Sequence, residues 1–144
     1  MEASKPFIVV GTDGSPHAER ALEFAAEEAR RRDAVVHVVT AWHVPAAVYR
    51  PGFAPMVNPS LEESTRQAAE DVAARAAENL RAQGLEVETG VRHGQAAEAL
   101  VEEAGGADLL VIGSRGHGGF SGLLLGSVGQ QCAHHAPCPT VIVR

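Results

Sequence analysis

Lysine is almost absent from this sequence. Lys5 is the only lysine among the 144 residues, and every other strongly basic side chain is an arginine. A P-loop binds nucleotide phosphates through the pattern G-x4-G-K-[ST] and needs a lysine in that loop, so the sequence excludes this kind of phosphate site. An excess of basic charge is also absent, since the formal net charge is -6. Because nucleic-acid binding depends on a basic stripe that releases phosphate counterions, we expect no nucleic-acid partner.

Cysteines and long apolar runs are scarce as well. Cys132 and Cys138 are too few for a disulfide framework, and no third cysteine or carboxylate at ligand spacing completes a metal site. The N-terminus lacks the pattern of a signal peptide, and no apolar run approaches the ~20 residues of a membrane span. We therefore expect a cytoplasmic protein with no membrane partner. The composition, 45% hydrophobic and 21% charged, predicts one globular domain over residues 1–144.

What the sequence does contain is a regular alternation of short apolar runs with amphipathic segments. This pattern predicts four helices between five strands, at residues 7–10, 34–41, 85–91, 107–112 and 140–143. Continuous apolar runs indicate strands that are buried on both faces, whereas the alternation in 85–91 predicts a half-exposed edge strand. The order predicts an α/β protein with a five-stranded parallel sheet flanked by helices on both faces.

Local signals predict where three of the helices begin. Ser15 and Pro16 suit the N-cap and the first position of the first helix, and Ser60 opens a capping box before the second. We expect the last helix to run from about Ser121 to His134. The proline-rich segment 42–59 interrupts the alternation, and its length favours either a functional flap or a packed surface loop.

Two glycine-containing turns follow the two strands expected at the centre of the sheet. After the apolar run 107–112 come Gly113 and Gly116, then nine residues, then Gly126 and Ser127; after the first strand comes the turn 11–15. Glycines let backbone N–H groups approach an anion, and parallel sheets bind ligands at the carboxyl ends of their strands. Neither the G-x-G-x-x-G pattern nor an acidic residue ending the second strand is present, so the turns do not fit a dinucleotide site. The spacing G-x2-G-x9-G-[ST] predicts a different nucleotide-phosphate site.

Three segments carry a resemblance to a known family: VVGTDGS at 9–15, ADLLVIGSRGHGGFSGLLLGSV at 107–128 and HHAPCPTVIVR at 134–144. Over its whole length the chain resembles single-domain members of the universal stress protein family, in the branch that binds ATP. The resemblance implies a Rossmann-like sheet with strand order 3-2-1-4-5 and ATP as the ligand, with Mg²⁺ on its phosphates. It also implies a homodimer that pairs through the edge strand at residues 140–143, since an uncovered apolar edge tends to pair with another chain.

The same resemblance assigns roles to residues by position. Asp13 would contact the ribose hydroxyls or a phosphate-bound Mg²⁺, and Ala41 would offer backbone groups to the adenine edge. Ile112 and Gly113 would lie near the sugar, and the phosphates would be held by Gly116, Gly126, Ser127 and Val128. The candidate set is completed by Gly11 and Thr12, which begin the first turn, and by Arg115, a cation that could replace the P-loop lysine.

Simpler interpretations of some of these residues stay open. Asp13 could be only a turn residue, as aspartate before glycine often is, and His117 could be solvated. Trp42 and Phe53 could pack on the core instead of stacking on adenine.

Three functions are compatible with the sequence. The first is an ATP-binding regulatory or stress-response protein, in which nucleotide controls contacts with unknown protein partners. The alternative is a slow ATPase or nucleotidyl-transfer enzyme that uses the same crevice. No catalytic residue is assigned, because the sequence holds no recognisable triad, HExxH motif or carboxylate pair at the predicted site. A third possibility, a dimeric interaction protein with an empty pocket, would make the glycines purely structural.

Overall fold

The computed structural model describes residues 4–44, 52, 59–116 and 125–144. Strands and helices alternate along the chain in the order β1 (Phe7–Gly11), α1 (Pro16–Arg32), β2 (Val35–Trp42), α2 (Pro59–Ala82), β3 (Val87–His93), α3 (Ala96–Glu103), β4 (Leu109–Gly113), α4 (Ser127–His135) and β5 (Thr140–Val143). The five strands and four helices expected from the apolar pattern are all present. The segment 42–59, expected to form a flap or a packed loop, lies largely outside the described residues.

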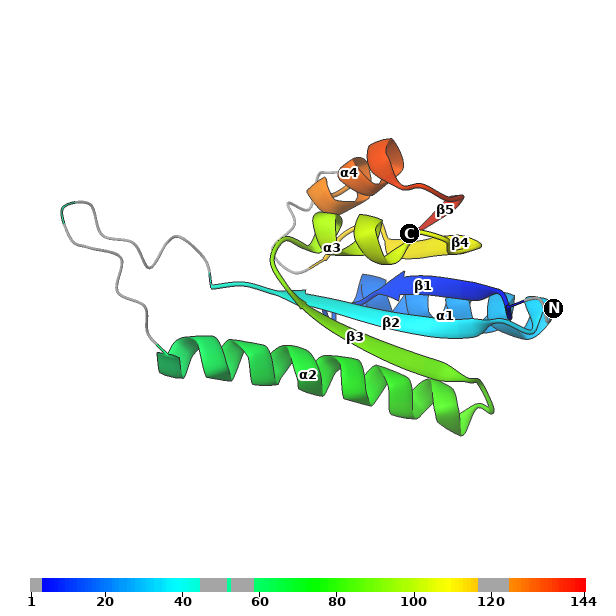
Figure 1. Ribbon diagram of the computed structural model, residues 1–144, viewed down its shortest axis with the longest axis horizontal. Helices are drawn as coiled ribbons and strands as arrows, with labels where there is room; N and C mark the ends of the chain where they lie inside the picture. The colour runs from blue at the N-terminus through cyan, green and yellow to red at the C-terminus, as the bar shows by residue number, and fades with distance from the viewer. Residues whose placement is uncertain (1–3, 45–51, 53–58, 117–124) are drawn as a thin grey trace.

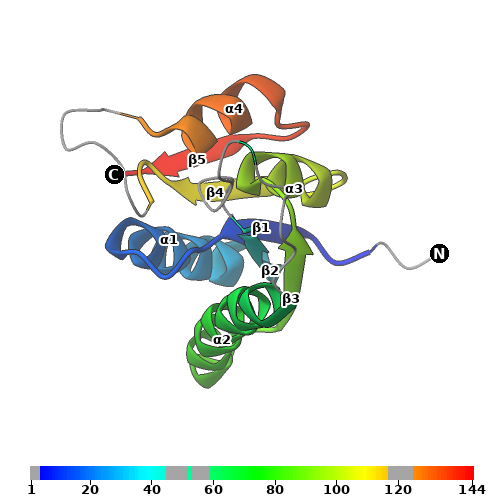
Figure 2. The same ribbon diagram turned by 90° about the vertical axis from the view of Figure 1, so that its left-hand side faces the viewer.

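The strands form one parallel sheet in the order β3-β2-β1-β4-β5, which confirms the predicted topology. Helices α1 and α2 cover one face and α3 and α4 cover the other (Figure 1, Figure 2). The chain leaves β1 toward the first face and leaves β4 toward the second. Because β1 and β4 are neighbours, their carboxyl ends form the switch point at which α/β sheets bind ligands.

The central strands are apolar because both of their faces are buried. Ile8 and Val10 of β1 face the core beneath α1 and α2, while Val9 between them faces the core beneath α3 and α4. All three side chains are fully buried. The hydrophobic effect of this double-sided burial, about 1.5–3 kcal/mol per side chain, holds β1 rigidly behind the turn that follows it.

Helix starts agree with the sequence prediction for α1 but not for α2 and α4. Ser15 caps α1, since its Oγ accepts a hydrogen bond from Ala18 N at 3.3 Å. The capping box predicted at Ser60 is wrong: α2 already begins at Pro59, whose fixed φ suits the first helical position. The last helix begins at Ser127, after an extended Gly126, and Leu125 is not helical. The predicted start near Ser121 lies outside the described residues.

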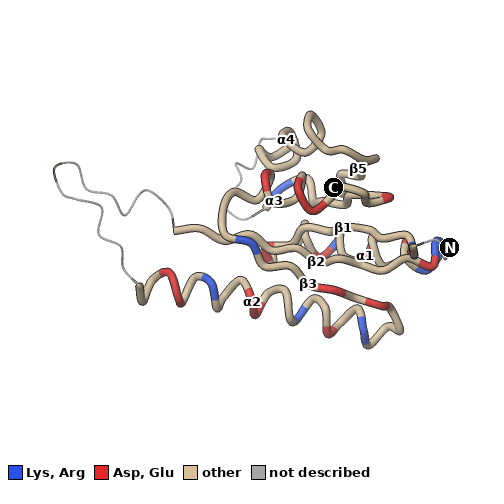
Figure 3. The backbone as a smooth tube through the Cα atoms, viewed as in Figure 1, with Lys and Arg blue, Asp and Glu red and all other residues tan. Residues whose placement is uncertain are grey.

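The two edge strands differ in character. As predicted, β3 is half-exposed and carries charged residues, and Arg92 pairs with Glu102 and Glu103 of α3. Strand β5 forms the opposite edge and is half-buried throughout. Acidic and basic residues alternate along α2 and do not gather into a basic stripe on that helix (Figure 3).

Candidate functional site

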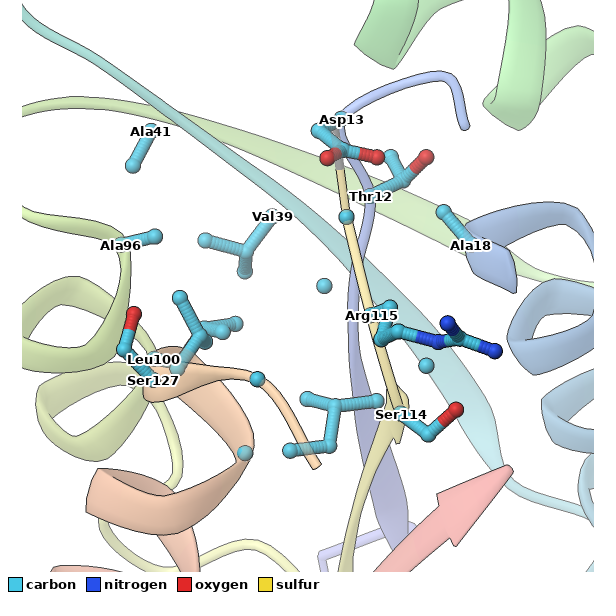
Figure 4. A pocket seen from close by; sticks show the side chains of 17 residues that line it. Thr12, Asp13, Ala18, Val39, Ala41, Ala96, Leu100, Ser114, Arg115 and Ser127 are labelled. Atoms are coloured by element: carbon cyan, nitrogen blue, oxygen red, sulfur yellow. The ribbon is translucent and has the colours of Figure 1, made fainter. Parts of the chain in front are cut away.

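A pocket of about 390 Å³ opens at the carboxyl ends of β1, β2 and β4, a volume within the range of small-molecule sites (Figure 4). All eleven residues singled out from the sequence line it: Gly11, Thr12, Asp13, Ala41, Ile112, Gly113, Arg115, Gly116, Gly126, Ser127 and Val128. The structure adds Ala18, Val39, Ala96, Leu100, Ser114 and Gly129 to these. Trp42 is not among the lining residues; its ring lies 4.5 Å from that of His93.

The first wall is the tight turn after β1. Thr12 N donates to Val39 O at 3.0 Å, which holds the start of the turn against β2. Ser15 N donates to Asp13 Oδ1 at 2.9 Å, so Asp13 is a turn residue in the sense expected of aspartate before glycine. The same carboxylate also borders the pocket (Figure 4). The two interpretations of Asp13 are therefore compatible, because one oxygen holds the turn while the other faces the crevice.

The second wall is the end of β2, which continues past the end of β1. Odd-numbered residues of β2 direct their backbone groups toward β1: Val35 N donates to Pro6 O at 2.9 Å, and Val39 O accepts from Thr12 N. A continued ladder would bring Thr12 O to the N–H of Ala41. Among the described residues this bond is not made, because the chain turns away at Thr12. Ala41 thus directs one donor and one acceptor into the space beyond β1.

The third wall is the turn after β4, where two glycines are needed for different reasons. A Cβ on Gly113 would lie 2.8 Å from His17 O and 2.9 Å from His17 C, so the backbone of α1 leaves no room for a side chain. A Cβ on Gly116 would collide with Oδ2 of Asp13. The two glycine turns predicted to face one ligand therefore meet across the pocket at Asp13 and Gly116.

The fourth wall is the first turn of α4. Gly126 N donates to Ser114 O at 2.8 Å, and the first intrahelical bond runs from Gln130 N to Gly126 O at 3.0 Å. The N–H groups of Ser127, Val128 and Gly129 precede that bond, and Gly126 has no side chain to cap them. These amides and the positive end of the helix dipole make this wall suitable for an anion.

Among the described lining residues, only Asp13 and Arg115 are charged. The Arg115 side chain extends toward α1 (Figure 4). Its charge is felt by His17, whose pKa is lowered by burial and then by Arg20 and Arg115, against an opposing effect of Asp13. No group of three or more metal-ligating side chains occurs in the described part of the chain. The lone Asp13 carboxylate still fits Mg²⁺, which typically binds one or two carboxylates together with phosphate oxygens and waters.

Several residues at the site were missed in the sequence. Ser114 lies inside the glycine motif, and its polarity between Gly113 and Gly116 was a usable signal. Leu100 and Ala96 come from α3, and the topology predicts their position because α3 and α4 cover the same face. His17 has no sequence signal, since a polar residue in the first turn of a helix is ordinary.

The fold and the site together define a doubly wound α/β protein with a crevice at its switch point. The sequence profile of the universal stress protein family matches residues 7–144. The chain belongs to the universal stress protein family.

Individual relatives agree with this assignment. The chain is 36% identical over 138 residues to a universal stress protein of Mycolicibacterium smegmatis, covering 95% of this chain but 45% of that relative. It is also 36% identical over 140 residues to a universal stress protein of Thermus aquaticus, covering 95% of this chain and 97% of the relative. The chain thus spans about half the length of some of its relatives and nearly all of others.

Solved structures of the family have the same fold. A universal stress protein from Archaeoglobus fulgidus superposes with a TM-score of 0.73 at 28% identity, over 99% of this chain and 100% of that one. A universal stress protein in complex with cAMP gives 0.71 at 29% identity, over 96% and 97% of the two chains. An Archaeoglobus fulgidus complex with dAMP gives 0.67 at 26% identity, over 98% of each.

Proposed function

We propose that this protein binds ATP in the pocket at the switch point and acts as a nucleotide-dependent regulatory protein of the stress response. The observation that carries the proposal is the convergence of three kinds of group on one cavity: the open backbone edge of Ala41, the Asp13 carboxylate and the amides at the start of α4. Adenine nucleotides bound to two similar family members, cAMP and dAMP, support it.

Each part of the nucleotide has a complementary wall. Adenine presents a donor and an acceptor side by side, which match the C=O and N–H of Ala41. The apolar side chains of Val39, Leu100 and Ile112 surround the space next to it. Asp13 faces the ribose hydroxyls or a Mg²⁺ ion on the phosphates, and the phosphates lie against Gly116, Gly126, Ser127 and Val128. In this arrangement Gly11, Thr12 and Gly113 shape the floor, and Arg115 adds positive charge behind it.

The charges around the pocket favour binding over turnover. Phosphoryl transfer requires a placed base or water-positioning group and several cations around the phosphates. Within the described lining, Asp13 is the only acidic side chain and Arg115 the only basic one. We therefore infer that nucleotide works chiefly as a regulatory ligand, and slow hydrolysis or nucleotidyl transfer is the alternative that the experiment must distinguish.

Two measurements on the purified protein test the proposal. Denaturation followed by chromatography identifies any copurified nucleotide, and isothermal titration with ATP, with and without Mg²⁺, measures affinity. We expect bound ATP, affinity that depends on Mg²⁺ and no turnover within hours. Release of ADP or AMP that accumulates with time favours the enzyme, and the absence of binding would contradict the proposal. For glycine substitutions at the site, Gly90→Ala is a control of the same type, because Gly90 does not line the pocket and a Cβ there meets only ordinary contacts at 3.8 Å or more.

The proposal includes a homodimer in which the edge strand β5 pairs with a second copy. Pro139 O accepts from Leu110 N of β4, and Val143 O accepts from the N–H of Ser114, just after β4, so the odd-numbered residues of this segment face β4. Thr140 and Ile142 consequently direct their backbone groups outward, at the edge of the sheet. Antiparallel pairing about a two-fold axis would satisfy these groups.

A cytoplasmic location is also proposed. Cys132 and Cys138 are both free thiols, which supports a reducing compartment. No helix in the described part of the chain is long and apolar enough to cross a membrane.

A further inference from the structure

Ser114 joins the two halves of the glycine motif. Its N–H donates to Val143 O at 2.7 Å, and its C=O accepts the N–H of Gly126 at 2.8 Å. The residue is buried, with 3% of its surface exposed. Its position therefore sets the distance from the turn after β4, Gly113–Gly116, to the first turn of α4 at Gly126–Ser127. These are the two segments against which the phosphates of the proposed nucleotide lie.

The side chain of Ser114 points to α1, where it meets His17. Ser114 Oγ lies 3.4 Å from His17 Nδ1, and Arg20 Nη2 lies 2.9 Å from the same nitrogen. A guanidinium can only donate, so Nδ1 is the acceptor and the imidazole is neutral with its proton on Nε2. His17 also contacts the motif through its backbone, because its carbonyl packs against Gly113.

We propose that His17 is a positioning residue of the anion site, whose neutral imidazole fixes Ser114 and thereby the spacing between Gly113–Gly116 and Gly126–Ser127. This inference rests on the proposed nucleotide function and adds to it a residue outside the pocket lining. His17 acts through Ser114, and we assign it no direct contact with the nucleotide.

Protonation of His17 would undo this arrangement. A protonated Nδ1 cannot accept from Arg20, and its contact with Ser114 would have to reverse so that Nδ1–H donates to Oγ. The new positive charge would lie near Arg20 and Arg115, and among the described residues Asp13 opposes their effect. It would also lie at the N-terminal end of α1, where the helix dipole disfavours a cation. We therefore expect acidification to shift the imidazole away from Arg20, to reorient the Ser114 hydroxyl and to disturb the spacing between Gly113–Gly116 and Gly126–Ser127.

The first test needs no nucleotide. Imidazole ¹⁵N shifts should show the Nε2–H tautomer at neutral pH, and the amide signals of Ser114 and Gly126 should titrate with the same midpoint as His17. In His17→Asn, whose Oδ1 can replace Nδ1 as a non-titrating acceptor, this titration should disappear. An Nδ1–H tautomer, or Ser114 and Gly126 amides that ignore His17, would overturn the inference whatever the protein binds.

The second test measures ATP affinity between pH 5 and 8 in the wild type and in His17→Asn and His17→Ala. Loss of one hydrogen-bonded link predicts a Kd about 3- to 10-fold higher for His17→Ala at pH 8. His17→Asn should stay within about twofold of the wild type at pH 8 and lack the additional loss of affinity that the wild type shows on acidification. The protonation of ATP itself is common to all three proteins, so only differences between them count.

The outcomes separate the two proposals. Parallel pH profiles in the wild type and His17→Asn would overturn the role of His17 and leave nucleotide binding intact. If no protein binds ATP at any pH, the proposed function fails, and the tautomer and amide titrations alone decide whether His17 positions Ser114.

Discussion

At the scale of single residues, glycines of one motif serve different purposes. Gly113 leaves room for the backbone of His17, which cannot move without shifting α1, whereas Gly116 leaves room for the side chain of Asp13. A side chain can rotate away and a helix backbone cannot. The first glycine is thus needed for folding and the second for the shape of the pocket.

This difference predicts that substitution by alanine lowers stability at Gly113 and nucleotide affinity at Gly116. Gly113→Ala should lower the free energy of unfolding by about 1–3 kcal/mol through overpacking. Gly116→Ala should change stability by less than about 0.5 kcal/mol but displace the Asp13 carboxylate and raise the Kd for ATP at least tenfold. Urea unfolding and calorimetric titration measure the two quantities, with Gly90→Ala as the control. Equal destabilisation by both substitutions would contradict this division of roles.

His17 gives a pH dependence whose sign can be worked out. Its pKa in the folded protein is lowered from the ordinary 6.5, first by burial and then by Arg20 and Arg115, so below pH 6.5 the unfolded chain binds more protons than the folded one. Stability should therefore rise with pH through this range and be lost as the pH falls from 6.5 toward the folded pKa. Urea midpoints of the wild type should fall more steeply on acidification than those of His17→Asn, and identical slopes would exclude the effect.

At the scale of elements, the start of α4 shows how one helix end can serve both folding and binding. Gly126 is held extended by its bond to Ser114, and the helix begins at once with Ser127. A glycine N-cap leaves the first amides to water or to a ligand. A better-capped helix would compete with an anion for the same donors.

Ser127→Asp should separate these two roles. A carboxylate in the first turn favours the helix dipole by about 0.3–1 kcal/mol, so the protein should be as stable as the wild type or slightly more so. The same charge should repel the phosphates and raise the Kd for ATP at least tenfold. Ser127→Asn is the neutral control of equal size. If ATP affinity were unchanged in Ser127→Asp, the proposed position of the phosphates at the start of α4 would be wrong.

How far the sequence predicts these elements depends on what holds each one. Continuous apolar burial is local information, so the strands were found to within a few residues. The helix starts at Pro59 and Ser127 were missed. At α4 the decisive contact is the hydrogen bond from Gly126 N to Ser114 O, and Ser114 is distant from the helix in the sequence. The same holds for the site: residues within the glycine motif were predictable and Leu100 follows from the topology, whereas His17 comes next to Ser114 only through the packing of α1.

At the scale of the whole molecule, the two edges of the sheet differ in charge and in their tendency to pair with another strand. Arg92 and its two glutamate partners give β3 a charged edge, which discourages strand pairing. Strand β5 offers Thr140–Val143, a short and largely apolar edge. Assembly through β5 would leave the carboxyl ends of β1 and β2 untouched, since both lie on the far side of β4 in the sheet order.

Thr140→Pro tests that assembly. The substitution removes an N–H that faces outward and spares the bonds to β4, and proline is tolerated at such edge positions. We expect a folded monomer by analytical ultracentrifugation where the wild type sediments as a dimer. Val141→Pro, which removes an N–H facing β4, should unfold the protein and serves as the contrast. A monomeric wild type at micromolar concentration, or a dimeric Thr140→Pro, would contradict pairing through β5.

The early end of β1 has a consequence for hydrogen exchange. Val39 and Ala41 lie two residues apart in one buried strand, yet only Val39 has β1 beside it. The amide of Ala41 should exchange with solvent deuterium much faster than that of Val39, although strand amides usually exchange slowly. Adenine nucleotide should slow it selectively. The hydrogen-bond ladder between β1 and β2 ends before Ala41. An adenine base can therefore bind to the backbone groups of β2 that have no strand beside them.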